Sequence, residues 1–422
     1  MVLKALLTRR QKSMGSAYRL FYDNPIHVVR GEGVWLFDAE GNKYLDMYNN
    51  VPHVGHCHPQ VVDAISRQAG TLNTHTRYLH ENVLNLAERL TAKFSDDLDT
   101  AMFCCTGTEA NELALRIARR CTGGTGIIVT DFAYHGNSQA IYEISTDIVP
   151  AEDVPDYVVT VPAPDTYRGE HRNEDAGVRY AEYVRDAIAI LESRGIKLAA
   201  FVIDTIISSS GVVSPPAGYL SRVAEIVRES GGLFVADEVQ PGFGRTGKNF
   251  WGFEADGVAP DIVTMGKPMG NGHPLSAVVT RRELVDTFSN YGRYFNTFGG
   301  NPVSCAAGLA VLDIIEGENL QQNALEVGQH LVDGLWKLAD DHECIGDVRG
   351  TGLFLAVELV TDRDERTPAT ELTIRVVNDL RNRGVLTGAI GPDENILKLR
   401  CPMVLTRADA DVALNVLDDV LP

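Results

Sequence analysis

The sequence predicts an α/β protein built on a mostly parallel sheet that helices cover on both faces. Three near-continuous apolar runs, at residues 199–204, 232–237 and 261–265, are typical of strands buried on both sides. Between the first two runs, apolar side chains recur with the spacing of one helix face, at Leu220, Val223, Ala224 and Val227. Unalternated strands separated by helices favour a parallel sheet over an antiparallel one.

The length of 422 residues suits two or three domains. We expect the predicted sheet to lie in a large domain at residues 56–310. Residues 1–55 and 311–422 mix short strands with helices and lack comparable apolar runs. We therefore expect one small α+β domain built from both ends of the chain.

Composition narrows the classes of partner. A net charge of −19 argues against nucleic acid and anionic membrane, so an anionic ligand would require a locally basic pocket. Seven cysteines are too sparse for a disulfide framework, and the apolar residues near the N-terminus precede the basic ones, the reverse of a secretory signal. No apolar run approaches the length of a membrane span. We expect a cytoplasmic enzyme that acts on a small molecule.

Charged side chains stand where the predicted strands end. Asp204 and Asp237 close two of the runs, and Lys267 follows the third by two residues. Ligands of parallel sheets bind beyond the carboxyl ends of the strands. An aspartate and a lysine there could serve pyridoxal 5′-phosphate (PLP), which needs a carboxylate beside its ring nitrogen and an amine for a Schiff base. Taken singly, Asp237 as a loop cap and Lys267 as a surface lysine are the commoner outcomes.

A phosphate cradle is predicted earlier in the chain. A strand-like run at residues 101–105 leads through Thr106, Gly107 and Thr108 into a helix expected at residues 109–120. The N-terminus of a helix offers free N–H groups and a positive dipole end to an anion. Thr106 and Glu109 also fit an ordinary capping box.

A second candidate lies after a strand predicted at residues 126–130. Tyr134, in Tyr134-His135-Gly136, could place its ring against a cofactor. Taken alone, a packed loop tyrosine is the simpler reading.

Taken together, these motifs resemble the class III, fold-type I aminotransferases. The resemblance extends from about residue 33 to residue 353 and is strongest in three segments, at residues 107–111, 236–247 and 264–268. It implies that the cofactor is PLP, that Lys267 forms the Schiff base and moves protons, and that Asp237 pairs with the pyridine nitrogen. It also implies that Val239 backs the ring and that Gln240 reaches its 3′-oxygen.

Further residues receive roles from the same resemblance. Gly107 and Thr108 would hold the cofactor phosphate, and Tyr134 would stack on the ring. Thr297 would reach the phosphate bound by a neighbouring subunit. The resemblance therefore implies a homodimer with active sites at the subunit interface.

Two other motifs are set aside. Gly242-x-Gly244-x-x-Gly247 matches a dinucleotide fingerprint and nearly matches a P-loop, but Asn249 stands where a P-loop needs Ser or Thr, and no helix is expected to begin there. A cluster of possible metal ligands, His53, His56, Cys57 and His58, lacks metal-site spacing. No metal is predicted.

The C-terminal region bears on the reaction type. Where related aminotransferases carry a carboxylate-binding arginine before a Pro-Pro pair, the resemblance aligns Lys398, and Cys401 replaces the first proline. Arginine matches a planar carboxylate, whereas lysine is a point charge that accepts other anions. The closest resemblance is to a branch that contains ethanolamine-phosphate and phosphohydroxylysine phospho-lyases. The segments that carry it are residues 49–59, 76–80, 163–169, 366–370 and 398–403.

The resulting hypothesis is elimination of phosphate from an O-phosphorylated amino alcohol such as ethanolamine phosphate, which would yield acetaldehyde, ammonia and phosphate. Arg77 and Lys398 are the predicted phosphate ligands. An ordinary ion pair is nearly as good a reading for Arg77, and a structural role is preferred for Arg400. Two alternatives stay open: an ω-aminotransferase acting on amines or ω-amino acids with a keto-acid acceptor, and an inactive relative.

Overall fold

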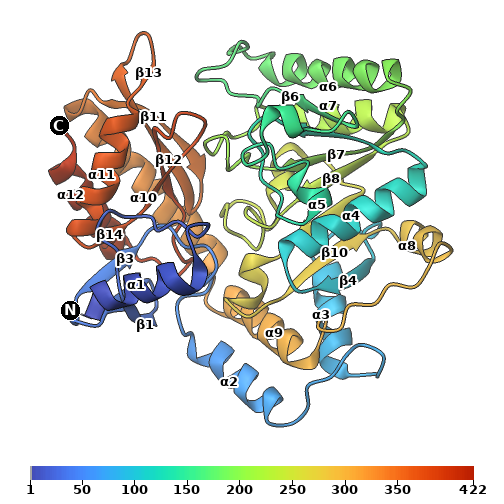
Figure 1. Cartoon of the computed structure of the whole chain (residues 1–422), viewed down its shortest axis with the longest axis horizontal. Helices are drawn as coiled ribbons and strands as arrows, with labels where there is room; N and C mark the ends of the chain where they lie inside the picture. Colours follow the sequence, from blue (N-terminus) through green and yellow to red (C-terminus); the bar gives the residue numbers. More distant parts are fainter. Residues whose placement is uncertain (1) are drawn as a thin grey trace.

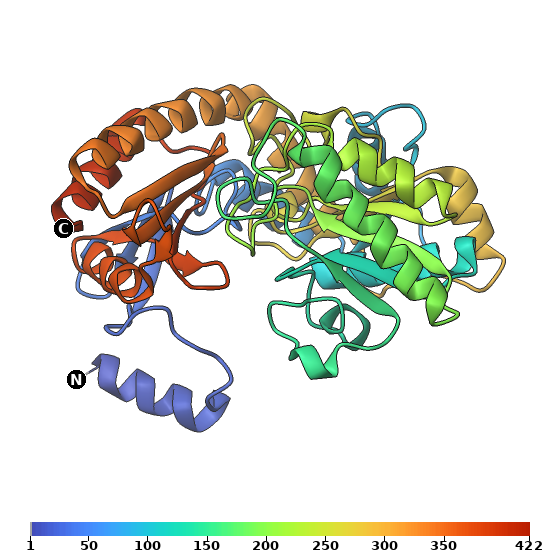
Figure 2. The ribbon, with the colours of Figure 1, turned by 90° about the horizontal axis from the view of Figure 1, so that it is seen from above.

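The computed structural model describes residues 2–422, which form two lobes (Figure 1). Residues from the middle of the sequence form one lobe, and residues from both chain ends lie together in the other. Helix α1 (Val2–Met14) buries none of its side chains and lies apart from the rest of its lobe (Figure 2). No helix in the described chain is long and apolar enough to cross a membrane.

A seven-stranded sheet organises the central lobe, in the order β4-β10-β9-β8-β7-β5-β6. Strand β10 pairs antiparallel with both of its neighbours, and the remaining pairs are parallel. The strands are β4 (Thr100–Cys104), β5 (Gly126–Thr130), β6 (Val158–Val161), β7 (Leu198–Asp204), β8 (Leu233–Asp237), β9 (Ile262–Met265) and β10 (Ser276–Thr280). The prediction of a mostly parallel sheet is confirmed.

Helices cover both faces of this sheet, because alternate strand residues enter two different hydrophobic clusters. Phe201 and Phe234 pack in the cluster that contains α6 (Ala176–Ser193) and α7 (Tyr219–Glu229). Val202 and Val235 pack on the opposite face in the cluster that contains α4 (Gly107–Thr122). The remaining helical segments of this lobe are α2 (Pro59–Ala69), α3 (Glu81–Thr91), α5 (Gln139–Tyr142), α8 (Arg282–Ser289), α9 (Pro302–Gly317) and the short turns Ala151–Asp153, Gly252–Asp256 and Lys267–Gly270.

The three predicted strands agree with β7, β8 and β9 to within one residue. Strands β7, β8 and β9 are parallel neighbours, with Asp204 opposite Asp237 and Asp237 opposite Thr264. The polar residues that follow them therefore meet at one edge of the sheet. Helix α4 begins at Gly107, two residues before the predicted start, because Thr106 is its N-cap and accepts a hydrogen bond from the Glu109 N–H at 3.1 Å.

The chain ends form two smaller sheets. One has the order β1-β2-β3-β14, from β1 (Val28–Glu32), β2 (Trp35–Asp38), β3 (Lys43–Asp46) and β14 (Val385–Leu386). The other has the order β11-β12-β16-β15, with β13 paired to β12, from β11 (Ile345–Thr351), β12 (Phe354–Asp362), β13 (Thr367–Pro368), β15 (Gly388–Ile390) and β16 (Ile396–Leu399). Helices α10 (Leu320–Asp341), α11 (Thr370–Asn382) and α12 (Arg407–Val420) complete this lobe.

One expectation about this lobe was wrong. Strand β12 is buried from Phe354 through Val360, so residues 311–422 do contain a long buried run. The strand lies between β11 and β16 and packs against α10 and α11, which explains why it is buried. Its one charged residue in that run, Glu358, is paired with Arg168 and Arg349. The proposed boundaries at residues 55 and 310 stay a prediction.

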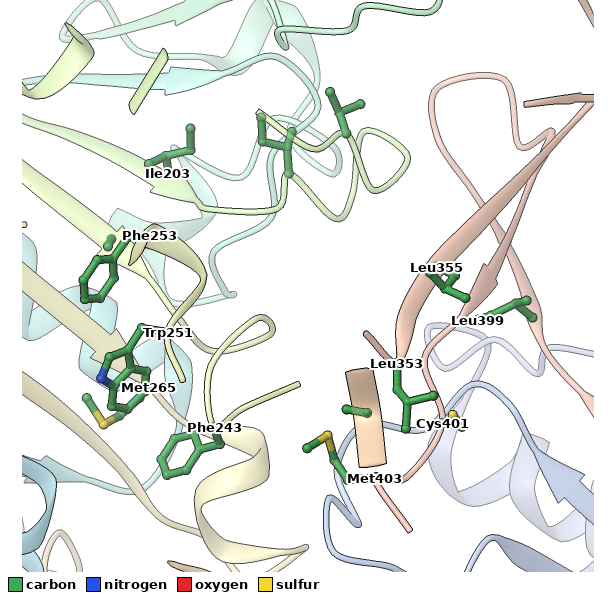
Figure 3. Close-up of a cluster of buried hydrophobic side chains, with 14 of the residues drawn as sticks. Ile203, Phe243, Trp251, Phe253, Met265, Leu353, Leu355, Leu399, Cys401 and Met403 are labelled. Carbon is green, nitrogen blue, oxygen red and sulfur yellow. The ribbon is translucent and has the colours of Figure 1, made fainter. Parts of the chain in front are cut away.

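The two lobes share a hydrophobic contact (Figure 3). Phe243 and Trp251 of the central lobe belong to the same cluster as Leu353, Cys401 and Met403 of the C-terminal region. The buried guanidinium of Arg245 joins the same regions, donating to the carbonyls of Leu353 at 3.0 Å and Cys401 at 2.7 Å. This contact fixes the C-terminal strand β16 beside the carboxyl edge of the large sheet.

Candidate active site

A cavity with a volume of about 350 Å³ opens at the carboxyl edge of the large sheet. We call it the strand-end cavity. The seven predicted cofactor residues from a single chain all line it: Gly107, Thr108, Tyr134, Asp237, Val239, Gln240 and Lys267. His135 and Asp204 line it as well. The volume is within the range of about 300–1,000 Å³ that is usual for small-molecule sites.

Lys267 follows β9 and begins a single helical turn. Its backbone φ of 24° is unusual for a residue with a side chain, a strain typical of functional sites. Burial, followed by the nearby Arg400 guanidinium, lowers the pKa of the Lys267 amine to about 8. A larger fraction of this amine is therefore uncharged near neutral pH than of an ordinary lysine, and an uncharged amine is the form that reacts with a carbonyl.

Asp237 is held in place by three hydrogen bonds. Its Oδ2 accepts from the Asn111 side chain at 2.9 Å and lies 2.7 Å from His135 Nδ1, while its Oδ1 accepts from the Val239 N–H at 3.1 Å. Its neighbour Asp204 has a pKa raised by burial and then by the charge of Asp237. The arrangement orients a carboxylate toward the cavity, as a protonated ring nitrogen requires.

Sequence reasoning did not assign a function to His135 or Asn111. Both lie within motifs that it quoted, at residues 134–136 and 107–111. Both are buried, and the side chain of each contacts Asp237 Oδ2. The one sequence feature that could have indicated them is their position next to predicted site residues, because His135 follows Tyr134 and Asn111 lies three residues after Thr108.

The start of α4 suits a phosphate. The first N–H groups of a helix lack partners inside it. The Thr106 side chain satisfies that of Glu109, which leaves those of Gly107 and Thr108 for a ligand. A Cβ at Gly107 would lie only 3.0 Å from Val239 Cγ2, so glycine keeps the cradle open beside the residue predicted to back the ring. The donors, carboxylate and amine present here therefore fit PLP.

An adjoining cavity of about 610 Å³ shares Lys267, Gln240 and Tyr134 with the strand-end cavity. Its wall includes the buried side chains of Lys398 and Arg400. Lys398 lies in β16 and Arg400 directly follows its last residue, and both side chains face the same cavity.

Arg400 belongs to the site more closely than the sequence indicated. It donates to Gln240 and, at 3.2 Å, to the carbonyl of Tyr48. Lys398 lies 3.4 Å from the carbonyl of Ser208. Within residues 2–422, neither side chain forms a salt bridge with a carboxylate.

Two predicted residues lie elsewhere in the single chain. Arg77 and Thr297 are exposed, and neither lines these cavities in the described structure. The Arg77 guanidinium lies 3.9 Å from the centre of the Phe295 ring. A role for either residue at a partner's active site stays a prediction.

The other candidate motifs have structural partners. His53 contacts the carbonyl of Phe243 at 2.8 Å, His56 bonds to Asp46 at 2.8 Å, and His58 caps α2.

The glycines at 242–247 form consecutive turns, followed by a short helical turn at Gly252–Asp256. This geometry differs from the long helix that follows a dinucleotide-binding loop.

Comparison with known proteins identifies the family. The model of the class III aminotransferases matches residues 19–421. The chain is 42% identical to ethanolamine-phosphate phospho-lyase homolog 1 of Caenorhabditis elegans, over 99% of this chain and 93% of that protein. It is 45% identical to an alanine–glyoxylate aminotransferase 2-like protein of Drosophila melanogaster, over 95% of this chain and 84% of that protein.

A solved structure agrees with these relatives. A phospholyase from Arthrobacter, in complex with phosphoethanolamine, superimposes with a TM-score of 0.95 at 45% identity and covers 99% of this chain and 100% of its own. The fold, the residues of the strand-end cavity and the family match are mutually consistent. The chain therefore belongs to the class III aminotransferase family, PLP-dependent enzymes of fold type I.

Proposed function

We propose that this enzyme is a phospho-lyase that eliminates phosphate from an O-phosphorylated amino alcohol, with ethanolamine phosphate as the preferred substrate. The observation that carries the proposal is the pair of buried basic side chains, Lys398 and Arg400, on the cavity wall beside Lys267. Buried charges are stable only when they are compensated. A phosphate dianion would compensate both within reach of the reacting amine.

The charge of the whole protein makes this pair significant. A chain with a net charge of −19 repels anions over most of its surface. Lys398 and Arg400 are buried on the wall of the adjoining cavity without a salt bridge in the described chain, whereas its carboxylates Asp393 and Glu394 are exposed. The deep part of this cavity is therefore a local exception. The phosphoethanolamine bound by the Arthrobacter neighbour supports the same class of substrate.

The residues suggest a division of labour. PLP, when bound, supplies an electron sink for the carbon next to the substrate nitrogen. Asp237 keeps the ring nitrogen protonated, and the Lys267 amine removes a proton from that carbon. Lys398 and Arg400 hold the phosphate while the bond between the next carbon and oxygen breaks. The released fragment would hydrolyse to acetaldehyde and ammonia.

One incubation tests this proposal. The holoenzyme is mixed with phosphoethanolamine alone, and phosphate and ammonia are measured over many equivalents of enzyme. A lyase continues to turn over, whereas an ω-aminotransferase stops after one equivalent unless a keto acid is added. If a panel of amine phosphates yields no phosphate while a keto acid supports amine transfer, the aminotransferase alternative replaces this proposal.

We also propose that the enzyme is a homodimer whose subunits share their active sites. An exposed apolar surface supports this: Leu79 is 94% exposed and Phe298 is 68% exposed. The two loops that carry them lie together, with the rings of His75 and Phe295 5.7 Å apart. A partner on this surface would bury these side chains and could bring Arg77 and Thr297 to the neighbouring site.

Subunit mixing tests the shared site. Arg77→Ala and Lys267→Ala chains are each expected to have little activity as pure dimers. A refolded mixture forms mixed dimers with one intact site, so about a quarter of the full activity should return. A mixture no more active than its components would contradict the sharing of Arg77, and light scattering gives the oligomeric state independently.

A cytoplasmic location stays a prediction.

A further inference from the structure

Asp147 is a carboxylate in the adjoining cavity that the proposed mechanism does not yet use. It follows helix α5, and its backbone N–H donates to the carbonyl of Ala133 at 3.1 Å. Its side chain shares the cavity wall with Lys398 and Lys267. Its Oδ1 is buried, yet it has no hydrogen-bond partner among residues 2–422.

Other carboxylates of the active-site region differ from Asp147, which is itself half-buried. Asp237 accepts three hydrogen bonds, and Glu238 accepts from Thr205 at 2.6 Å and from the N–H groups of Gly252 and Phe253. Asp204 accepts from Ser208 and Ile206. A buried polar atom without a partner costs about 1–3 kcal/mol. The unsatisfied oxygen of Asp147 is therefore better explained by a ligand than by stability.

The surroundings of Asp147 favour its protonated form. Burial raises the pKa of this carboxyl to about 7, although the charge of His135, the residue's own backbone N–H and the charge of Lys398 act in the opposite direction. Tyr134 lies beside it, and the same cavity wall carries further titratable or charged side chains, those of Tyr48, Lys267, Asp393, Glu394 and Arg400. Near neutral pH a large fraction of Asp147 therefore carries a proton, and a phosphate dianion in the same cavity would increase that fraction by repulsion.

Building on the proposed function, we propose that Asp147 is the acid that protonates phosphate as it leaves the substrate. When the carbon–oxygen bond breaks, its electron pair goes to the oxygen of the phosphate. The Asp147 carboxyl transfers its proton to that phosphate and becomes a carboxylate, while the proton removed from carbon stays on the Lys267 amine. Water restores the Asp147 proton before the next turnover.

The position beside Lys398 supports this role. Lys398 would hold the phosphate by its charge. The neutral, protonated carboxyl of Asp147 on the same wall could donate a hydrogen bond to the phosphate without repelling it. An ionised carboxylate at this place would oppose phosphate binding. Asp147 would thus be protonated when the substrate binds and ionised when the phosphate product leaves.

The test compares two leaving groups. Asp147→Asn keeps the shape and a hydrogen-bond donor but has no proton to transfer. With phosphoethanolamine, its kcat should fall about 10²-fold at neutral pH, the usual range for loss of a general acid. With ethanolamine O-sulfate, whose sulfate is a far weaker base, turnover should stay close to that of the wild type. Asp153→Asn, an exposed residue six positions along the same loop, is the matched control.

The pH profile provides an independent measurement. Wild-type kcat/KM for phosphoethanolamine should fall as pH rises through about 7, because Asp147 of the free enzyme loses its proton, and this fall should be absent from Asp147→Asn. Equal losses for phosphate and sulfate would show a structural role and overturn the inference. Full phosphate release by Asp147→Asn would also overturn it while leaving the phospho-lyase proposal intact. A wild type that releases no phosphate would overturn both.

Discussion

The two adjoining cavities differ in how the protein compensates their charged groups. In the strand-end cavity, Asp237 is satisfied by Asn111, His135 and the Val239 N–H. In the adjoining cavity, Lys398 has a backbone carbonyl at 3.4 Å, and Asp147 Oδ1 has no partner in the described residues. The protein thus satisfies the Asp237 carboxylate of the first cavity by itself, whereas the charged groups of the second cavity need a ligand to compensate them.

Under the proposed function, this difference distinguishes the cavity expected to hold the cofactor from the cavity expected to hold the substrate. A cofactor site with satisfied polar groups can stay the same while the reaction changes, because its geometry does not depend on the substrate. A cavity with uncompensated charge selects the ligand whose charge complements it. Substitutions in the two cavities should therefore have different consequences for cofactor binding and for substrate choice.

The largest expected effect comes from Lys267→Ala. Loss of the reacting amine should reduce phosphate release by more than about 10³-fold, because the same group reacts covalently and transfers the proton. The visible absorbance of the bound cofactor should change as well. Lys337→Ala, on the exposed face of α10, should match the wild type in both measurements. A variant that keeps a tenth of the activity would assign the chemistry to another residue.

Lys398→Met should affect the adjoining cavity alone. Methionine keeps the apolar length of the side chain but removes the charge, so kcat/KM for phosphoethanolamine should fall about 10²-fold, the loss expected for a charge-assisted hydrogen bond. The cofactor absorbance and affinity should stay unchanged. An amine that lacks a phosphate, assayed by its single-turnover reaction with the cofactor, serves as the control. Equal losses for both compounds would show that Lys398 acts on the cofactor site.

Gly107→Ala should affect the strand-end cavity with a smaller effect. The added Cβ would lie 3.0 Å from Val239 Cγ2 and narrow the phosphate cradle. Overpacking of this kind costs about 1–3 kcal/mol, so we expect cofactor affinity to fall about tenfold, measured by fluorescence titration of the apoenzyme. The double variant Gly107→Ala/Val239→Ala should regain part of it. Failure to regain any would place the damage in the backbone of α4.

The same contrast explains what the sequence could predict. The strand-end cavity is assembled from short contiguous motifs at strand ends and a helix start, such as those of Gly107 and Lys267. The local sequence pattern at strand ends and at the helix start therefore predicted both the fold and these two residues. The neighbours of Asp237 were missed because His135 and Asn111 contact it across more than a hundred residues of chain.

The adjoining cavity was less predictable for a physical reason. Arg400 reaches it only because β16 packs beside the large sheet through the contact between the lobes, and alternation along a strand cannot say which face meets a cavity. Asp147 lies on a loop without a motif, and its significance rests on a missing hydrogen bond. Absence of a partner is a property of the folded structure alone.

The smallest expected effect is a proton taken up when phosphate binds. Burial, then Arg400, lowers the pKa of Lys398 well below that of an ordinary lysine, and a bound dianion would raise it again. Between the lowered and the raised pKa, binding must therefore draw a proton from solution. Calorimetry with inorganic phosphate, in buffers of different ionisation enthalpy and at an alkaline pH where free phosphate is already the dianion, measures this uptake as a slope. The slope should be positive, should decrease in Lys398→Met and should persist in Asp153→Asn. A slope of zero in the wild type would mean that both Lys398 and Asp147 keep their protonation states when the anion binds, and the charge compensation would then have to come from Arg400.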